Sequence, residues 1–416
     1  MVKPDTDTQS HIEAHGIIGD MRTAALVNDK GSVDFFCWPE FDSPSLFCAL
    51  LDSPEAGIFQ LAPDMPDARR EQIYLPDTNV LLTRWLDNEA VVEVTDLLPV
   101  SDCADELPVL MRRVRVVSGR ATFTLRCAVR HDYARADTHA RVDGADVWFE
   151  ASGQPALRLA ASQPLSVEHQ AACSTFALAQ GQTAEFVLGA AQDPRVRVGS
   201  SDLALQHTVQ FWRQWIAQST YRGRWREMIN RSALALKLLT SRKEGAIIAA
   251  ATFGLPETRG GERNWDYRYT WIRDASFTVY AFVRLGFVEE ANNFMRWLRG
   301  RVGDGCDQPL KLNIMYGIDG RRELPERELT HLAGHGGATP VRVGNGAVDQ
   351  VQLDIYGELL DAVYLTNKYG EAISHEGWQH VTQLVDEVCE VWDQKDVGIW
   401  EMRGEKHHFL HSRLMC

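Results

Sequence analysis

The sequence predicts a two-part chain, in which an antiparallel β-sandwich precedes an α-helical domain. Up to about residue 195, short stretches with a period of two residues alternate with turn residues, as is typical of antiparallel strands. From Asp202 onwards the apolar residues recur with a period near 3.6, which indicates amphipathic helices. The 416 residues also exceed what one hydrophobic core usually fills, so at least two domains are expected.

The predicted sandwich covers residues 1–198 and consists of short strands joined by turns. Three strand pairs are expected: 23–27 with 33–37, 80–85 with 90–95, and 109–117 with 121–129. The last pair is expected to meet across Ser118-Gly119, because these residues suit a tight turn. Arg112, Arg113 and Arg115 interrupt its apolar positions, which suits a sheet with one wet face. Many strands without intervening helices favour an antiparallel sandwich.

The predicted helical part begins with a linker helix over 199–222 and continues as a helical domain over 223–416. Its helices are expected near Arg224 and over 275–285, 289–299, 347–366 and 374–393. Gly286 is placed to end one helix and Ser374 to cap the start of another. Two long segments between helices, 243–266 and 303–345, have little periodicity, and loops of such length are often functional.

Charge and composition exclude several classes of partner. The formal charge is -14, from 43 basic and 57 acidic residues, which disfavours nucleic acid and anionic membrane surfaces. The polar start and the lack of any apolar run of about 18 residues predict a cytoplasmic protein without a signal peptide or membrane span. The eight cysteines contain no C-x-x-C pair, so they are expected to be buried and to form neither a zinc site nor a disulfide framework. Oligomeric state is not predicted.

Three segments concentrate tryptophan, arginine and carboxylates: 264–274, 340–345 and 398–401. A sugar site needs this mixture, because arginine and aspartate hold hydroxyls while indole rings stack on the C–H faces of a pyranose. Glycoside hydrolysis needs in addition one carboxylic acid and one carboxylate. Taken singly, each feature has a structural alternative. Arg273-Asp274 could be an ion pair at a helix start, Glu401 a solvated loop carboxylate, and the tryptophans packing residues.

Taken together, the motifs resemble glycoside hydrolase family 15, the glucoamylase family, in its bacterial and archaeal form, which includes trehalases. The resemblance rests on Ile18-Gly19-Asp20, Gly31-Ser32-Val33-Asp34, Pro39-Glu40-Phe41-Asp42-Ser43-Pro44, Arg263-Asn264-Trp265-Asp266-Tyr267-Arg268-Tyr269, Trp271-Ile272-Arg273-Asp274, Pro340-Val341-Arg342-Val343-Gly344-Asn345, Gln352-Leu353-Asp354-Ile355-Tyr356-Gly357-Glu358 and Gly398-Ile399-Trp400-Glu401. These motifs span almost the whole chain. The run from Arg263 to Asp274 is specific enough to make chance a poor explanation.

The resemblance implies a β-sandwich followed by an (α/α)6 barrel, and it assigns roles to individual residues. Arg273 and Asp274 match the pair that holds the hydroxyls of the non-reducing-end glucose. Trp271 resembles an aromatic wall of that subsite, Arg342 an arginine that reaches the sugar, and Trp400 the tryptophan before the acid. Glu401 matches the general acid, whose pKa a pocket walled by tryptophans would raise.

Two departures from the family pattern bear on activity. Met402 stands where fungal glucoamylases carry a second acidic residue, so binding beyond the first glucose cannot be carried over. The family's catalytic base is a glutamate far downstream, beyond Cys416. The chain also offers about half of the twelve helices that the barrel requires. We therefore expect a truncated barrel that is inactive by itself.

The function expected first is an inverting exo-acting glycoside hydrolase that releases glucose from α-linked glucosides, of the glucoamylase or α-glucosidase type. An α,α-trehalase on the same scaffold is the alternative. A phosphorylase, or a carbohydrate-binding protein without catalysis, is a less favoured reading. The substrate would be an oligosaccharide or disaccharide, and neither metal nor organic cofactor is expected.

Overall fold

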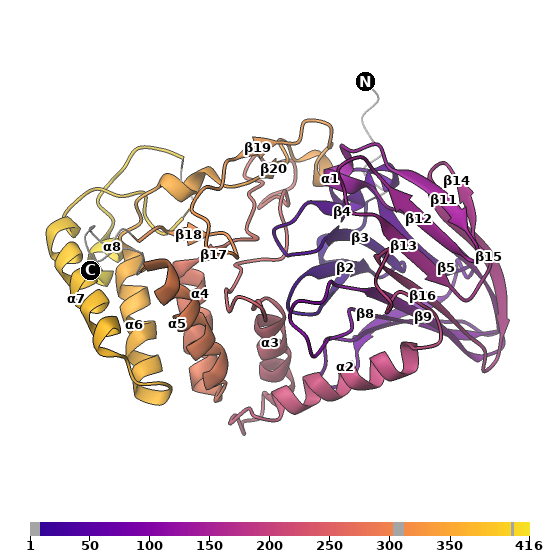
Figure 1. The fold of residues 1–416 in the computed structure, drawn as a ribbon, viewed down its shortest axis with the longest axis horizontal. Coiled ribbons are helices and arrows are strands. Elements are labelled where there is room, and N and C mark those ends of the chain that lie inside the picture. The colour runs from indigo at the N-terminus through magenta and orange to yellow at the C-terminus, as the bar shows by residue number, and fades with distance from the viewer. Residues whose placement is uncertain (1–8, 303–311, 401–402) are drawn as a thin grey trace. The chain divides into compact units, whose positions relative to one another are not determined.

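The computed structural model describes residues 9–302, 312–400 and 403–416, which form two compact units (Figure 1). The first unit contains the chain up to Ala217 together with 254–264 and 330–341. The second contains 218–253, 265–329 and 342–416. Parts of both long segments that the sequence left without periodicity thus belong to the first unit.

The first unit is an antiparallel β-sandwich of two eight-stranded sheets. One sheet has the order β1 (His15–Gly19), β2 (Ala24–Asn28), β3 (Ser32–Cys37), β5 (Ile58–Pro63), β10 (Arg120–Ala128), β15 (Ala171–Ala179) and β14 (Ser166–Glu168), with β4 (Ser45–Phe47) paired to β3. The other has the order β11 (His139–Asp143), β12 (Asp146–Glu150), β13 (Leu157–Ala161), β16 (Thr183–Ala190), β9 (Leu110–Ser118), β8 (Val91–Leu97), β7 (Leu81–Leu86) and β6 (Arg69–Tyr74). The predicted sandwich is confirmed.

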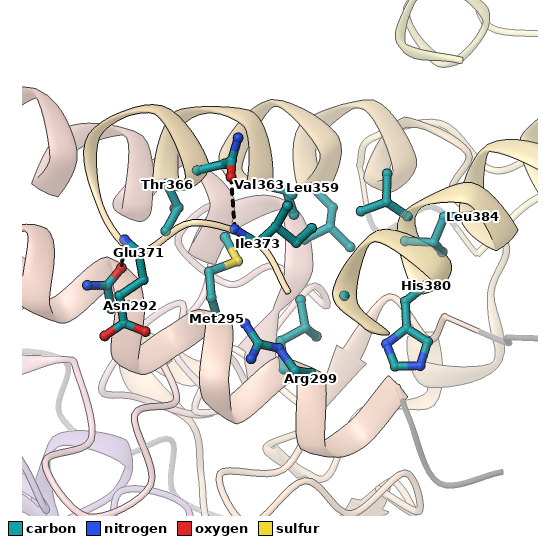
Figure 2. Close-up of a pocket in the computed structure, with 14 residues that line it drawn as sticks. Asn292, Met295, Arg299, Leu359, Val363, Thr366, Glu371, Ile373, His380 and Leu384 are labelled. Carbon is teal, nitrogen blue, oxygen red and sulfur yellow. Dashed lines mark hydrogen bonds between the residues drawn. The ribbon is translucent and has the colours of Figure 1, made fainter. Parts of the chain in front are cut away.

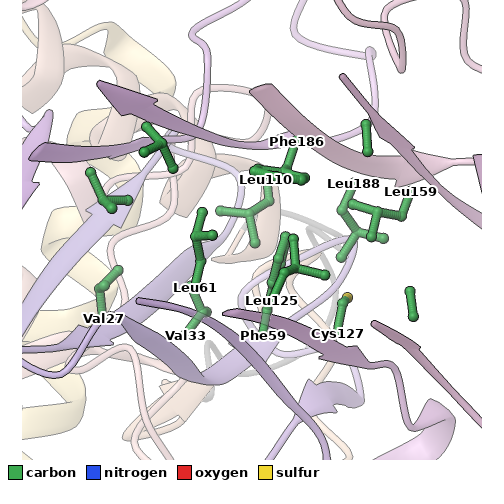
Figure 3. Close-up of a cluster of buried hydrophobic side chains, with 14 of the residues drawn as sticks. Val27, Val33, Phe59, Leu61, Leu110, Leu125, Cys127, Leu159, Phe186 and Leu188 are labelled. Atoms are coloured by element: carbon green, nitrogen blue, oxygen red, sulfur yellow. The ribbon is translucent and has the colours of Figure 1, made fainter. Parts of the chain in front are cut away.

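The core of this unit lies between the two sheets and is apolar (Figure 3). Val33, Phe59 and Leu125 come from one sheet, and Leu110 and Phe186 from the other; all five are buried. Each such side chain stabilises the fold by about 1.5–3 kcal/mol relative to exposure. The period-two pattern of the sequence follows from this burial, since alternate residues of each strand point inward.

One predicted strand pairing is wrong. The stretches that become β9 and β10 are adjacent in sequence, but β9 pairs with β8 and β16, whereas β10 pairs with β5 and β15. Gly119 between them has φ +77, and a Cβ there would collide with the backbone carbonyl of Glu89. Because Val116 and Phe123 both face the core, the short connection carries the chain from one sheet to the other instead of closing a hairpin.

The arginines of β9 also differ from the prediction. Arg113 and Arg115 do lie on the outer face, but Arg112 is completely buried. Its Nε donates a 2.7 Å hydrogen bond to Oδ1 of Asp96, which is equally buried. The guanidinium also donates to the backbone carbonyls of Phe59 and Gly31. An arginine in this sequence position is therefore a structural element of the sandwich interior.

The cysteines do not all occupy buried positions. Cys37, Cys48 and Cys127 are buried, as expected, whereas Cys173 is half-buried. The other described cysteines, Cys103, Cys389 and Cys416, are exposed. All seven are free thiols. The expectation for Cys306 falls outside the described residues.

Two helices accompany the sheets in the first unit, α1 (His131–Ala134) and α2 (Ser201–Ile216). The second helix is the one predicted as a linker. Oγ1 of Thr208 accepts a 3.2 Å hydrogen bond from the backbone nitrogen of Val100, and Leu205 and Val209 pack against an apolar cluster of the sandwich. These contacts place α2 within the sandwich unit. The short 3-10 helices of this unit are η1 (Ile12–Ala14), η2 (Ala49–Leu51), η3 (Pro54–Ala56) and η4 (His335–Gly337).

The second unit is helical, as predicted. Its helices are α3 (Arg226–Leu238), α4 (Ile272–Leu285), α5 (Val288–Val302), α6 (Asp354–Tyr369), α7 (His375–Val391) and α8 (Leu410–Met415). Two short ladders join β17 (Thr270–Trp271) to β18 (Met315–Tyr316) and β19 (Arg327–Glu328) to β20 (Arg342–Val343). Helix α4 packs against α5 and α6, and α6 packs against α8. No helix among the described residues has the length and apolarity to cross a membrane.

Local signals set the helix ends in this unit. Gly286 ends α4 with φ 93, and Oγ of Ser374 caps α7 by accepting a 3.1 Å hydrogen bond from the nitrogen of Gly377. Both predictions are confirmed. The predicted helix over 347–366 begins later, at Asp354. Residues 346–349 form the 3-10 helix η5 instead, and the extended conformation of Gln350 separates it from α6.

Candidate active site

The candidate site is built around the N-terminal turn of α4. Trp271 is the residue before the helix, and Arg273 and Asp274 lie in its first turn. Nη2 of Arg273 lies 3.5 Å from Oδ2 of Asp274. Both side chains retain accessible surface, 16% for Arg273 and 45% for Asp274. The pair is therefore available to a ligand, and a carboxylate in the first turn is also favoured by the helix dipole.

The guanidinium of Arg273 is held from the start of α6. Nη1 of Arg273 donates a 2.8 Å hydrogen bond to Oε1 of Gln352 and a longer one, 3.4 Å, to Oδ2 of Asp354. Gln352 and Asp354 are both fully buried. The group is thus fixed by residues that solvent does not reach, while its Nη2 side points toward Asp274. Such support restricts an arginine to one orientation before any ligand binds.

Asp274 combines an exposed side with a buried oxygen. Its Oδ2 is inaccessible and has no hydrogen-bond partner among the described residues. Burial raises the pKa of Asp274, the charge of Arg273 opposes this rise, and the carboxylate of Asp354 adds to it. The exposed side of this carboxylate, opposite the buried Oδ2, can accept hydrogen bonds from sugar hydroxyls. The carboxylate of Asp274 therefore favours a ligand that offers hydrogen-bond donors, such as hydroxyl groups.

Trp271 is nearly sealed by its neighbours. Only 2% of the residue is exposed, and its ring lies 6.1 Å from that of Tyr267 and 5.5 Å from the guanidinium of Arg273. Its Nε1 is buried without a hydrogen-bond partner in the described part of the chain. The indole therefore packs against Arg273. Its predicted role as an aromatic wall of the glucose subsite stays a prediction.

Arg342 belongs to a second cluster, which contains Trp265, Glu326 and Arg403. Its guanidinium lies 4.7 Å from the centre of the Trp265 ring, and that of Arg403 lies 4.2 Å from the same ring. Glu326 accepts a 2.7 Å hydrogen bond from Nη2 of Arg403 and lies 3.5 Å from Nε of Arg342. Burial would raise the pKa of Glu326, but the hydrogen bond from Arg403 and the charges of both arginines hold it below its ordinary value. Arg342 is thereby joined to the segment that follows Glu401.

The loop that carries this cluster is anchored by a buried ion pair. Nε and Nη2 of Arg268 donate to the two carboxylate oxygens of Asp266 over 2.9 and 2.7 Å. The nitrogen of Gly344 donates to the same carboxylate over 3.1 Å, and Nδ2 of Asn345 donates to the carbonyl of Asp266. The segments 265–270 and 342–345 are consequently held together around Asp266, although more than 70 residues separate them in the sequence.

Glu401, the predicted general acid, lies outside the described residues, and Trp400 before it is 70% exposed. The segment that leads to Trp400 is nonetheless fixed. The nitrogen of Val397 donates to the carbonyl of Val351, and Oδ2 of Asp396 accepts from the nitrogen of Leu353 over 3.0 Å. These bonds join the segment to the residues that flank Gln352, the partner of Arg273.

Within the second unit, hydrogen bonds and ion pairs connect residues that lie in the predicted segments or beside them. Arg273 is bonded to the 352–354 segment, which is bonded to 396–397, and Arg342 shares Glu326 with Arg403. Arg273 with Asp274 forms one cluster, and Arg342 with Arg403 forms another.

Two protein-family models together match nearly the whole chain. Residues 5–220 match the model "Trehalase-like, N-terminal". Residues 223–416 match the model "Glycosyl hydrolases family 15". The chain belongs to glycosyl hydrolase family 15.

Several relatives of this chain are named trehalase. The chain is 36% identical to a protein named trehalase from Mycolicibacterium smegmatis, covering 97% of this chain and 64% of that one. Trehalases from Thermoplasma acidophilum and Thermoplasma volcanium are 33% and 32% identical, with 67% and 65% of their lengths covered. A shorter stretch of 176 residues is 31% identical to an isomaltose glucohydrolase from Kribbella flavida. The chain thus spans roughly two thirds of the trehalase relatives' length.

Four residues of this family 15 chain support the predicted site without having been assigned a role from the sequence: Gln352, Asp354, Glu326 and Arg403. Gln352 and Asp354 fell within a motif of the resemblance, but an aspartate at a helix start is equally expected as a cap. Glu326 and Arg403 have no sequence signal that points to each other. Only the folded chain shows that they meet.

One cavity of the helical unit is lined by none of the predicted sugar-site residues. This cavity, of about 80 Å³, lies between α5, α6 and α7 (Figure 2). Its wall is mainly apolar, with Met295, Leu359 and Leu384 among the lining residues. Arg299 and Glu371 also line it, but none of the residues predicted to hold glucose does, so we assign it no role in sugar binding.

Proposed function

We propose that this chain carries the glucose-binding part of an inverting α,α-trehalase. The observation behind the proposal is the Arg273–Asp274 pair at the start of α4, with Arg273 oriented from behind by Gln352. Relatives named trehalase, which align with almost the whole chain, support trehalose as the substrate. The sequence analysis placed a glucoamylase-type enzyme first, and the relatives favour its alternative.

The proposed catalytic domain is an (α/α)6 barrel, to which the described residues contribute α3 to α8. A complete barrel has twelve helices. In a chain as long as the trehalase relatives, further helices would complete the barrel and supply the general base. The apolar residues Trp378 on α7 and Trp392 directly after it are half exposed here, as expected for a face that further helices cover.

The proposed mechanism uses two carboxyl groups. Glu401 donates its proton to the glycosidic oxygen of trehalose, and the bond from that oxygen to the anomeric carbon of the gripped glucose breaks. A water molecule, deprotonated by the general base, forms the new bond to this carbon from the opposite face. The two carboxyl groups must stand about 6.5–9.5 Å apart to leave room for the water. Arg273 and Asp274 hold the hydroxyls of the reacting glucose. Arg342 and Trp400 are proposed to lie around it, and Trp271, which is nearly sealed, is proposed to support the subsite through its contact with Arg273.

Sugar binding by the 416-residue protein tests the proposal without requiring a general base. Isothermal titration calorimetry with trehalose, maltose and isomaltose should show the tightest binding for trehalose. Asp274→Asn should weaken that binding by about tenfold or more, since charge-assisted hydrogen bonds contribute about 1.5–3 kcal/mol. The matched control Asp361→Asn alters an exposed aspartate of α6 and should leave binding unchanged. Equal binding by the Asp274→Asn variant and the control would overturn the proposed site.

Product analysis distinguishes the reaction classes wherever the base is supplied by a longer form of the chain. An inverting trehalase converts one trehalose and one water into one β-glucose and one α-glucose, so nuclear magnetic resonance should first detect the two anomers in equal amounts. Two α-glucose molecules would indicate retention. A glucose phosphate formed only with added phosphate would indicate a phosphorylase. Trehalose binding without any product, in the longer form, would indicate a carbohydrate-binding protein.

Isomaltose is the second candidate substrate, because the chain also resembles an isomaltose glucohydrolase over 176 residues. That match covers 39% of this chain, against 97% for the Mycolicibacterium trehalase. Tighter binding of isomaltose than of trehalose in the same titration would replace trehalose as the proposed substrate.

A further inference from the structure

The start of α6 carries two carboxylates that face the last helix of the chain. Asp354 and Glu358 are four residues apart, which places them on one side of α6. Helix α8, which carries His411, packs against α6. We propose that Asp354, Glu358 and His411 form a binding site for a divalent metal ion, with Zn²⁺ as the best match.

The three side chains converge within the range that one ion can bridge. One potential ligand atom from each residue lies within 4.8 Å of the other two, and Nε2 of His411 is 3.9 Å from Oε1 of Glu358. Donor atoms around a tetrahedral zinc ion, bound at roughly 2.0–2.2 Å, are about 3.4 Å apart. Side-chain movements on the order of 1 Å would therefore close the site. His411 has the most room to make this movement, because its side chain is 42% exposed.

A second, independent observation points to a cation at this place. Asp354 is fully buried, and its Oδ1 has no hydrogen-bond partner among the described residues. Its other oxygen, Oδ2, lies 3.4 Å from Nη1 of Arg273. A buried, unsatisfied acceptor costs about 1–3 kcal/mol, more when charged. A metal ion on Oδ1 would satisfy this oxygen and leave Oδ2 to Arg273.

The donor set favours a borderline transition metal. Two carboxylates and one imidazole supply three protein ligands, and water can take a fourth position. Imidazole favours Zn²⁺ over Mg²⁺ or Ca²⁺, which prefer sets made entirely of oxygen. The two carboxylates carry two negative charges, which offset the double positive charge of the ion. Asp354 is shielded from water, so its charge is not compensated by solvent. The sequence analysis expected no metal, because glycoside hydrolysis needs none and the cysteines show no zinc-site spacing. Only the fold brings residue 411 to the start of α6.

This inference does not depend on trehalose hydrolysis. The site would support Arg273 indirectly, since Asp354 contacts both the ion and that arginine. Its test is accordingly metal binding and not enzyme activity.

Calorimetric titration of the chelator-treated 416-residue protein with Zn²⁺ tests the proposal. We expect one ion per chain, bound more tightly than Mg²⁺ or Ca²⁺. His411→Ala and Glu358→Gln should each weaken binding by at least about tenfold, because each removes one of three ligands. The matched control His375→Ala changes a histidine at the exposed start of α7 and should bind as the wild type does. Absence of binding, or binding that both site variants retain, would overturn the proposal.

A spectroscopic variant keeps the test valid if a substitution disturbs folding. His411→Cys replaces the imidazole by a thiolate, another good ligand for Zn²⁺ and Co²⁺. With Co²⁺, this variant should develop a sulfur-to-cobalt absorption band that the wild-type protein lacks. A wild-type protein and a variant with identical Co²⁺ spectra would show that position 411 does not contact the ion.

Discussion

Nη1 of Arg273 donates a 2.8 Å hydrogen bond to Oε1 of Gln352, which links the first turn of α4 to the residues just before α6. Gln352 is buried, so it cannot itself contact a large ligand. Its position behind the guanidinium makes it a positioning residue for the proposed glucose site. It acts by restricting the orientations of Arg273 before the sugar arrives.

Gln352→Leu should therefore weaken trehalose binding without removing any group that touches the sugar. We expect a loss of about tenfold, since a hydrogen bond to a charged group contributes about 1.5–3 kcal/mol. The exposed Gln379 of α7 provides the matched control, Gln379→Leu, which should bind normally. Restoration of binding by Gln352→Glu, which keeps an acceptor at this place, would separate orientation of Arg273 from a general packing defect. Unchanged binding by Gln352→Leu would contradict the assigned role.

Asp274 should make trehalose binding depend on pH. Its carboxylate accepts the strong, charge-assisted hydrogen bonds from the sugar only when ionised, and burial raises its pKa above the ordinary value despite Arg273. Binding should accordingly weaken as the pH falls through this raised pKa. Titrations across the acid range should show this loss for the wild type. Asp274→Asn should bind weakly and without the pH dependence, so a parallel dependence in both proteins would contradict the prediction.

The same raised pKa predicts an effect on stability with the opposite sign to that on binding. A carboxyl whose pKa is raised by folding contributes stability below its unfolded pKa, and that contribution is lost as the pH rises through the folded pKa. At neutral pH the ionised Asp274 therefore destabilises the fold. Asp274→Asn should show a higher melting temperature than the wild type at pH 7, and this difference should shrink in acid. A lower melting temperature for the variant at neutral pH would refute the prediction.

Glu326 should stabilise the loops around Trp265 at neutral pH and lose this effect in acid. Its pKa is lowered, because the hydrogen bond from Arg403 and the charges of both arginines outweigh its burial. The contribution is present above the unfolded pKa, about 4.3, and is lost as the pH falls through the lower folded pKa. Glu326→Gln should lower the melting temperature at pH 7 and flatten its decline in acid.

Hydrogen exchange locates the effect of Glu326. Peptides that contain Arg403 and Gly346 should exchange faster in Glu326→Gln, since both residues donate hydrogen bonds to that carboxylate. Glu323→Gln changes an exposed glutamate three residues away and serves as the control. Equal exchange in the two variants would show that Glu326 does not anchor these loops.

The sequence predicted the individual strands and helices better than it predicted which strands pair with each other. Periodicity identified the strands, and Gly286 and Ser374 marked helix ends, because these signals are local to the residues that show them. The pairing of β9 and β10 was wrong, since a turn sequence such as Ser118-Gly119 fits both a hairpin and a crossing between sheets. Which of the two forms depends on the apolar faces of strands far away in the sequence.

The candidate site shows the same contrast between residues with a local sequence signal and residues whose role depends on distant contacts. Arg273 and Asp274 were recognised from a motif that carries its own chemistry. Gln352 and Glu326 were not assigned, because a glutamine or glutamate acquires its role only from the group that it meets after folding. Arg112 was misread for a related reason. An arginine at an alternating strand position indicates a wet face unless a buried acid such as Asp96 faces it.

The Arg112–Asp96 pair should consequently be among the most sensitive points of the sandwich. Removal of one partner leaves the other charge buried and unpaired, at a cost of about 3–5 kcal/mol. Asp96→Asn and Arg112→Met should each lower the free energy of unfolding by this order, as measured by urea denaturation. The double variant should be more stable than the sum of the two changes predicts, because no unpaired charge remains. It should not regain wild-type stability, since the carbonyls of Phe59 and Gly31 lose their donor.

The control Arg84→Met breaks the partly exposed pair with Glu93 and should cost about 0–1 kcal/mol. Similar losses for Arg84→Met and Arg112→Met would show that burial of the Arg112–Asp96 pair does not set its importance.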